Sequence, residues 1–237
     1  METIYIVMPA YNEAENIKET IKQWYPIVED LSKQGVEAKL VIANDGSKDN
    51  TLEIMNEQKG DHPLFLPLDK PNSGHGATVL YLYHYAVEKG ADYIFQTDSD
   101  GQTDPNDFWQ MWRDRDHFDF LFGDRQGRQD GLSRVFVAKV LRLLVWLVFH
   151  VWVKDANTPF RLMKSEKLRP ILEVIPKGYF LSNVAVSAIA VKWNYAIGWY
   201  KVSFMPRRAG VNSINMKQII RIGRKALVDF KAINRKL

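Results

Sequence analysis

The sequence predicts an α/β fold: a mainly parallel, doubly wound sheet with flanking helices, followed by a basic, apolar helical part. Three observations predict it. Strand and helix patterns alternate through the first half, polar segments follow several of the predicted strands, and the sign of the charge reverses near residue 131. Alternating strands and helices are typical of βαβ units, whose sheets bind ligands at the carboxyl ends of the strands.

The elements of the first half follow from hydrophobic periodicity. Short apolar runs predict five strands, at 3–9, 38–45, 63–68, 91–98 and 118–124. Three helices are predicted between them. The first has Ile17, Ile21, Trp24 and Ile27 on one face, the second covers 50–58, and the third has Leu80, Tyr83, His84 and Val87 on one face.

The second half is apolar and basic. The segment 134–154 predicts an amphipathic helix that carries Lys139 and Arg142, and its uninterrupted apolar stretch, 143–153, is shorter than the roughly 20 residues that cross a membrane. The remaining elements are a buried helix at 182–191, a strand at 197–204 and a basic amphipathic helix at 215–237. Basic amphipathic helices lie in membrane interfaces, although a core helix with snorkelling cations has the same pattern.

Charge divides the chain. Residues 1–130 hold 12 Lys and Arg against 24 Asp and Glu, whereas residues 131–237 hold 20 against 4. A basic second half predicts an anionic partner, either nucleic acid or a membrane, and no nucleic-acid motif is visible.

The chain has no cysteine, which excludes disulfides and thiol nucleophiles, and its opening residues do not form a signal-peptide pattern. We therefore expect a cytoplasmic protein, peripheral at the membrane.

Two acids follow the fourth predicted strand, in the stretch TDSDGQTDP. Asp98 and Asp100 are two residues apart, so their side chains point to the same side of an extended turn. Such a pair binds a divalent cation, and Mg²⁺ typically takes one or two carboxylates together with substrate phosphates. A solvated acidic turn is the alternative interpretation.

Two further segments belong to the same predicted edge. In NDGSKDNT, Asp45 is placed to accept hydrogen bonds from a nucleobase, and Gly46 permits close approach of the backbone. In KPNSGHGA, Gly74 opens a helix whose terminal N–H groups favour phosphate or diol oxygens. The chain contains no G-x-G-x-x-G, which disfavours a dinucleotide dehydrogenase. His75 and His84 have no zinc-site spacing and are interpreted as polar loop and helix residues.

These motifs, with IVMPAYNEAENI before them, resemble family 2 glycosyltransferases, which have the GT-A fold. The downstream GDR, DANTPFRLMK and RRAGVNS resemble the branch of dolichol-phosphate mannose synthases and other polyprenyl-phosphate glycosyltransferases. The resemblance implies an inverting, metal-dependent enzyme. Residues 1–130 would bind a nucleotide-diphosphate sugar, and residues 131–237 of the same catalytic domain would bind a lipid-phosphate acceptor and the membrane.

The resemblance also implies roles for individual residues. The donor site would consist of Pro9, Ala10, Tyr11, Glu13, Asp45, Gly74 and Asp98. Asp98 and Asp100 would hold Mg²⁺ or Mn²⁺, assisted by Gln102. The catalytic residues would be Asp100, Asp155, Arg125, Arg161, Arg207 and Arg208, the arginines being candidates for phosphate contacts. Asp155 is the only acid between residues 131 and 165, and it is interpreted as a general base, an ion-pair partner of Arg161 or an ordinary helix-end residue.

The sequence departs from the pattern at three positions, which leaves the acceptor open. Asn44 stands where many relatives have Asp, Pro159 stands before Phe where the branch usually has Gly, and no Lys follows Ser213. Three alternatives therefore remain. They are transfer to a hydroxyl of a surface glycan or lipid-linked saccharide, a non-catalytic membrane-associated binding protein, and a sugar nucleotidyltransferase. The last is disfavoured because PAYNEAEN is not a Gly-rich basic loop.

Overall fold

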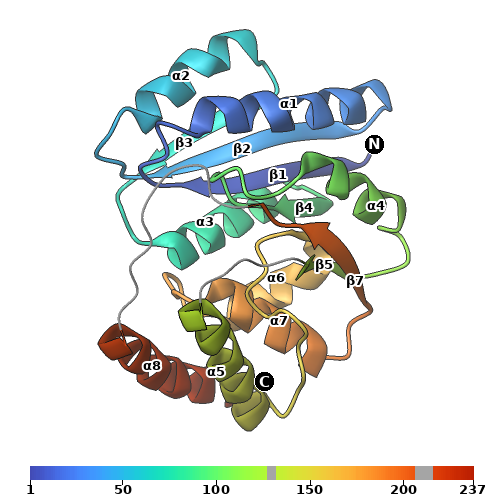
Figure 1. Cartoon of the computed structure of the whole chain (residues 1–237). Coiled ribbons are helices and arrows are strands. Elements are labelled where there is room, and N and C mark those ends of the chain that lie inside the picture. The colour runs from blue at the N-terminus through green and yellow to red at the C-terminus, as the bar shows by residue number, and fades with distance from the viewer. Residues whose placement is uncertain (127–131, 206–215) are drawn as a thin grey trace.

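A computed structural model describes residues 1–126, 132–205 and 216–237. Its centre is one seven-stranded sheet with the order β3-β2-β1-β4-β6-β5-β7 (Figure 1). The strands are β1 (Thr3–Ala10), β2 (Glu37–Asp45), β3 (Phe65–Lys70), β4 (Tyr93–Gln96), β5 (Phe120–Gln126), β6 (Arg161–Lys164) and β7 (Ile197–Ser203). The helices are α1 (Ile17–Lys33), α2 (Thr51–Asp61), α3 (His75–Glu88), the 3₁₀ turn η1 (Pro105–Asp107), α4 (Phe108–Arg113), α5 (Leu132–Phe149), α6 (Ser165–Val174), α7 (Ser182–Lys192) and α8 (Met216–Asn234).

The sheet is mainly parallel, as predicted. Strands β3, β2, β1 and β4 run parallel to one another, and β5 runs parallel to β7. The strand β6 is antiparallel to both of its neighbours, β4 and β5. The sequence did not predict β6, because its residues, RLMK, do not alternate between apolar and polar. Since β6 and β7 complete the sheet, the two halves of the chain form one fold.

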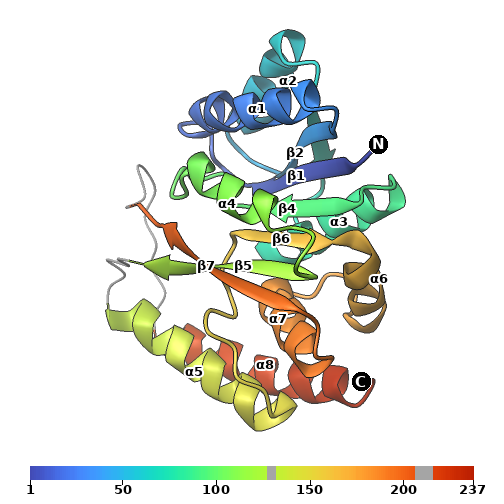
Figure 2. The ribbon, with the colours of Figure 1, turned by 90° about the vertical axis from the view of Figure 1, so that its right-hand side faces the viewer.

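Helices cover both faces of the sheet, and each face has its own core. One core contains the buried faces of α1 and α4 with Met55 of α2, and the other contains α3, α6 and α7. The helices α5 and α8 extend the second core and contact each other through Phe149 and Phe230, whose ring centroids are 5.4 Å apart. Figure 2 shows α5 and α8 side by side, at the end of the molecule opposite α1 and α2.

Two local predictions are corrected by the structure. The basic apolar helix does not continue to residue 154, because α5 ends at Phe149 and His150 has a left-handed φ of 58°. The fifth predicted strand, 118–124, is observed two residues later as β5, so Gly123, Asp124 and Arg125 of the GDR motif all lie inside it. Among the helices that the structure describes, none combines the length and the apolar character that crossing a membrane requires.

Candidate active site

The site lies at the carboxyl ends of β1, β2 and β4, where three loops are joined by hydrogen bonds. The backbone N–H of Asn12 donates to Ser47 Oγ (2.9 Å), and that of Lys48 donates to Asn12 Oδ1 (2.8 Å). Asn12 adopts a left-handed φ of 54°, and the N–H of Ala14 donates to Asp49 Oδ2 (3.1 Å). The loop after β1 is therefore fixed against the loop after β2.

The predicted donor residues after β1 differ in exposure. Pro9 and Ala10 are buried at the end of the strand, whereas the side chain of Tyr11 is exposed. Glu13 is buried and accepts a hydrogen bond from Asn16 Nδ2 (2.7 Å). Tyr11 is thus accessible to a ligand, and Glu13 holds the start of α1.

Asp98 and Asp100 are half-buried, whereas Ser99 between them is buried. Ser99 is buried, donates through Oγ to the carbonyl of Pro9 (2.8 Å) and accepts through its carbonyl from Thr20 Oγ1 (2.9 Å). This alternation of exposure agrees with an extended turn, in which residues two apart share a side. Asp100 Oδ1 accepts from the N–H of Gln102 (3.2 Å).

His75 contacts the first of these acids, which the sequence did not predict. Its Nε2 lies 3.0 Å from Asp98 Oδ1. Burial acts to raise the pKa of the Asp98 carboxyl, but the charge and hydrogen bond of His75, with Arg125 and Arg161 further away, outweigh burial and hold that pKa below its usual range. For His75 itself desolvation acts downward, and Asp98, Asp100 and Asp45 together raise the pKa of the imidazole. The sequence shows His75 between Gly74 and Gly76, but the distance along the chain gave no reason to expect a contact between His75 and Asp98.

The chemistry of this turn fits a hard divalent cation. Two outward carboxylates supply oxygen ligands, and a diphosphate and water would complete the coordination. Within the described residues there is no cluster of three or more His, Cys, Asp or Glu side chains suited to a metal ion, so the protein alone does not form a closed metal cage. The side chain of Gln102, which the sequence predicts to assist the metal, donates a hydrogen bond from Nε2 to the carbonyl of Met205 (2.9 Å).

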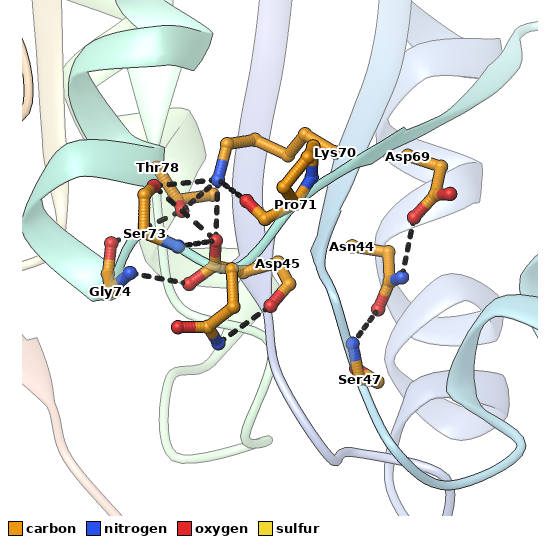
Figure 3. A network of polar contacts seen from close by, with 10 residues as sticks. Asn44, Asp45, Ser47, Asp69, Lys70, Pro71, Ser73, Gly74 and Thr78 are labelled. Carbon is orange, nitrogen blue, oxygen red and sulfur yellow. Dashed lines mark hydrogen bonds and ion pairs between the residues drawn. The ribbon is translucent and has the colours of Figure 1, made fainter.

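Asp45, which the sequence predicts to contact a nucleobase, is engaged by protein groups at the end of β2. The residue is buried, and Figure 3 shows its carboxylate inside a polar network. Asp45 Oδ1 accepts from Lys70 Nζ (2.5 Å) and from the N–H of Ser73 (2.8 Å), and Oδ2 accepts from the N–H of Gly74 (2.9 Å). Burial acts to raise the pKa of Asp45, and these hydrogen bonds, with the charge of Lys70, lower it overall. Because both oxygens are engaged, Asp45 fixes the entry to α3.

The glycines around this network serve close packing. Gly46 has a φ of +62°, and a Cβ there would lie 2.7 Å from the backbone nitrogen of Asn72. Gly74 caps α3 with a φ of +89° and gives its N–H to Asp45, so that group is not available to a phosphate. Gly76 lies within α3, where a Cβ would be 2.1 Å from the carbonyl oxygen of Phe180.

Asn44 pairs with a carboxylate on the neighbouring strand. Its Nδ2 donates to Asp69 Oδ1 (2.7 Å), and its Oδ1 accepts from the N–H of Ser47 (3.2 Å). An aspartate at position 44 would place two carboxylates against each other, so the Asn in this sequence is consistent with an acid at position 69.

Arg125 and Asp155 form a two-point ion pair on the other side of the site. Arg125 Nε lies 2.7 Å from Asp155 Oδ2, and Arg125 Nη2 lies 2.9 Å from Asp155 Oδ1. The guanidinium also lies over the ring of Phe204, 5.1 Å from its centroid. Asp155 is therefore an arginine partner, but of Arg125. A carboxylate held by both oxygens is poorly arranged to accept a proton.

Arg161 is fully buried, which does not support direct contact with a substrate. Its guanidinium donates to the carbonyls of Thr158 (3.0 and 2.6 Å) and Asn183 (3.2 Å), and it lies over the ring of Phe122. Burial lowers the pKa of Arg161, although Tyr83, Asp155 and Asp98 oppose that shift. Arg207 and Arg208 lie outside the described residues.

The sequence matches a known family over nearly its whole length. The model of glycosyl transferase family 2 matches residues 5–235. An undecaprenyl-phosphate 4-deoxy-4-formamido-L-arabinose transferase of Salmonella choleraesuis is 28% identical over 179 residues, 74% of this chain and 51% of that protein. The chain thus spans about half the length of this curated relative. An uncharacterised protein of Methanocaldococcus jannaschii is 27% identical over 232 residues, 93% of this chain and 96% of that protein.

Solved structures show the same fold. Glucosyl-3-phosphoglycerate synthase from Mycobacterium tuberculosis, in complex with Mn²⁺, UDP-glucose and phosphoglyceric acid, superposes with a TM-score of 0.71 at 15% sequence identity, over 99% of this chain and 80% of that chain. At that identity the similarity shows the fold, and it confirms the GT-A architecture that the motifs predicted. The similarity to a polyprenyl-phosphate transferase likewise confirms the predicted resemblance to that branch. With the family model covering residues 5–235, the chain belongs to glycosyl transferase family 2.

Proposed function

We propose that this glycosyltransferase moves a sugar from a nucleotide-diphosphate sugar to a polyprenyl phosphate, with inversion at the anomeric carbon and with Mg²⁺ or Mn²⁺ at Asp98 and Asp100. The observation that carries the proposal is the outward, half-buried pair of carboxylates at the carboxyl end of β4, beside the joined loops after β1 and β2. Nucleotide-binding sheets of this type place ligands at that edge.

The donor would lie over residues 1–130, against Tyr11 and the loops that Pro9, Ala10, Glu13, Asp45 and Gly74 shape. A bound divalent cation would supply positive charge at the departing diphosphate. Asp98 and Asp100 would orient the diphosphate by holding that cation. The solved relatives support this placement, since one was solved with both Mn²⁺ and UDP-glucose.

The transfer exchanges one bond at the anomeric carbon. An acceptor phosphate oxygen forms a bond to that carbon from the face opposite the leaving group, and the bond from the carbon to the diphosphate oxygen breaks. The leaving nucleoside diphosphate takes the electron pair. A phosphate acceptor is already an anion at neutral pH, so no general base is needed, in agreement with the engagement of Asp155 by Arg125.

The acceptor phosphate would be neutralised by arginines. Arg125 is at the site, in contact with Asp155, and Arg207 and Arg208 are candidates from the sequence. Arginine suits phosphate because its planar fork donates two parallel hydrogen bonds. The similarity to an undecaprenyl-phosphate transferase supports a lipid phosphate.

A membrane contact by residues 131–237 is part of the same proposal, with the protein peripheral at the cytoplasmic face. The exposed face of α5 presents Leu143, Trp146 and Leu147, whose side chains are about half exposed, and Trp152 follows at 63% exposure. Arg142 lies near the ring of Trp152 and donates to the carbonyl of Lys154. Aromatic, aliphatic and cationic side chains together are typical of interfacial helices.

The decisive experiment compares acceptors. The purified protein is given a panel of nucleotide-diphosphate sugars with Mn²⁺, and transfer to a short-chain polyprenyl phosphate is measured against transfer to an oligosaccharide. We expect transfer to the lipid phosphate, lowered in Arg207→Lys and Arg208→Lys with donor binding retained. Transfer only to the oligosaccharide, with Asp155→Asn inactive, would favour a hydroxyl acceptor. Absence of transfer and of donor hydrolysis would favour a non-catalytic protein.

A further inference from the structure

The position of His75 is fixed by the backbone on both sides. Gly74 provides the left-handed φ of +89° that starts α3, and Gly76 lets the first turn pack against the Phe180 carbonyl. The imidazole between them reaches the Asp98 carboxylate, with 3.0 Å between Nε2 and Oδ1. The His75 side chain is 57% exposed and the Asp98 side chain 28%, so the contact lies at the mouth of the site.

A second set of contacts holds the segment before His75. Asp45 accepts from the N–H groups of Ser73 and Gly74, the two residues that precede the histidine (Figure 3). Lys70 Nζ contacts Asp45 Oδ1, Ser73 Oγ (2.7 Å) and Thr78 Oγ1 (3.2 Å), and thereby ties the loop to the first turn of α3. The contacts run without interruption from Asp45, through the α3 entry, to Asp98.

We propose that His75 is a positioning residue that orients the Asp98 carboxylate for a divalent cation, and that Asp45 acts through the α3 entry to place His75. The inference rests on the proposed function in one respect, namely that the site takes a metal ion. The bond needs only an N–H on Nε2, which a neutral imidazole can carry. With Oδ1 of Asp98 held by His75, Oδ2 would be the oxygen that holds the cation.

This role explains how Asp98 and Asp100, which are two residues apart, keep the orientation that binding a cation requires. The charges of Asp98 and Asp100 repel each other, and a freely rotating Asp98 would turn away from Asp100. Hydrogen bonds to metal-binding carboxylates fix their direction, and their loss typically costs 10–100-fold in metal affinity.

The test measures Mn²⁺ binding directly. The dissociation constant of Mn²⁺ is determined by electron paramagnetic resonance for the full chain, in the presence of the nucleoside diphosphate from a UDP, GDP, CDP and ADP panel that gives the tightest binding. His75→Ala should weaken Mn²⁺ about 10–100-fold. His75→Gln, whose amide N–H reaches a similar position, should restore binding to within a few-fold of the wild type. His84→Ala, on the same helix, is the matched control and should leave it unchanged.

A double-mutant comparison tests the role of Asp45. Asp45→Asn should weaken the binding of Mn²⁺. The double variant Asp45→Asn/His75→Ala should lose less binding free energy than the sum of the losses in the two single variants, because the effects of residues in one network are not additive. Asp69→Asn, a carboxylate on the adjacent strand, is the control. In steady-state assays the KM for Mn²⁺ should rise in His75→Ala, while kcat at saturating Mn²⁺ stays within a few-fold.

The outcomes separate this inference from the proposed function. Mn²⁺ binding that is equal in the wild type, His75→Ala and His75→Gln would overturn the inference and leave the metal-dependent transferase intact. A wild type that binds no Mn²⁺ with any nucleotide would overturn both. If His75→Ala fails to fold, His75→Gln and the shorter His75→Asn replace it, and equal affinities in that pair would again reject the role.

Discussion

At the scale of single residues, the site is controlled by how each carboxylate is engaged. Asp98 and Asp100 face outward, Asp155 is held by Arg125, and Asp45 is enclosed by Lys70 and two backbone N–H groups. Four acids that look alike in the sequence therefore have three environments. The proposed cation site uses only the first two.

Removing one metal-binding carboxylate should abolish transfer without unfolding the protein. Asp100→Asn keeps the size of the side chain and the acceptor for the Gln102 N–H, but loses the charge that binds a cation. We expect at least about a 100-fold loss of turnover, since a lost charge contact of ~3 kcal/mol corresponds to that factor. The melting temperature without ligand should change little. Full activity of this variant, or of the wild type in EDTA, would contradict a metal-dependent reaction.

The buried pair of Asp45 and Lys70 should make stability depend on pH in the acidic range. The pKa of Asp45 is lowered in the folded state, so its contribution is complete above the unfolded value of about 3.9 and is lost as pH falls through the lower, folded pKa. Asp45→Asn should cost about 3 kcal/mol near neutral pH, because Lys70 loses its buried partner. The measurement is urea unfolding of both proteins from pH 7 to pH 3. If the difference in free energy of unfolding between the wild type and Asp45→Asn grew toward pH 3, the predicted direction of the pH dependence would be wrong.

At the scale of elements, the sequence predicted most of the helices and strands and missed β6, α4 and α6. The α1 face with Ile17, Ile21 and Trp24 is buried as expected, and the apolar helix 182–191 appears as α7. The strand β6 has the sequence RLMK, which does not alternate, and α4 has only six residues. The ten-residue α6 contains Pro170, a residue that is unfavourable inside a helix. The contact between His75 and Asp98 was missed for another reason. It joins two loops, and hydrophobic periodicity carries no information about which loops meet.

The exposed face of α5 gives an element-scale prediction about membranes. Trp146→Glu removes an aromatic anchor and adds a charge that an anionic surface repels. We expect at least about 10-fold weaker binding to phosphatidylglycerol vesicles, since burying one large apolar side chain contributes about 1.5–3 kcal/mol. Gln23→Glu on α1, which adds the same charge on the opposite face of the sheet, should have little effect. Binding of the wild type should weaken with salt. Equal binding to neutral and anionic vesicles would contradict the prediction that positive charge attracts the protein to the membrane.

At the scale of the whole molecule, the two charge halves share one sheet. The acidic residues 1–130 supply β1 to β5, and the basic residues 131–237 supply β6 and β7. The sequence predicted a single domain, because no low-complexity linker separates the two halves. It could not give the strand order, which depends on pairing between distant segments. The proposed donor and acceptor parts would therefore divide the surface of one structural unit.

Unfolding should accordingly be a single transition. Because β6 is hydrogen-bonded to β4 on one side and β5 on the other, neither half can lose its structure without exposing the edge of the other. We expect heat unfolding followed by far-ultraviolet circular dichroism and by tryptophan fluorescence to give coincident curves, with equal calorimetric and van't Hoff enthalpies. Two separated transitions would show that the halves are independent domains.

The insertion of β6 also has a consequence for the newly made chain. On the ribosome, β1 to β4 emerge first and in order, but the strand that covers the open edge of β4 is not made until Arg161–Lys164. At about 5–20 residues per second, that edge stays unpaired for several seconds. An uncovered strand edge is a template for pairing with other chains. Biogenesis of this protein should therefore be sensitive to holdase chaperones and to slow codons between β4 and β6, and less so to those after β7.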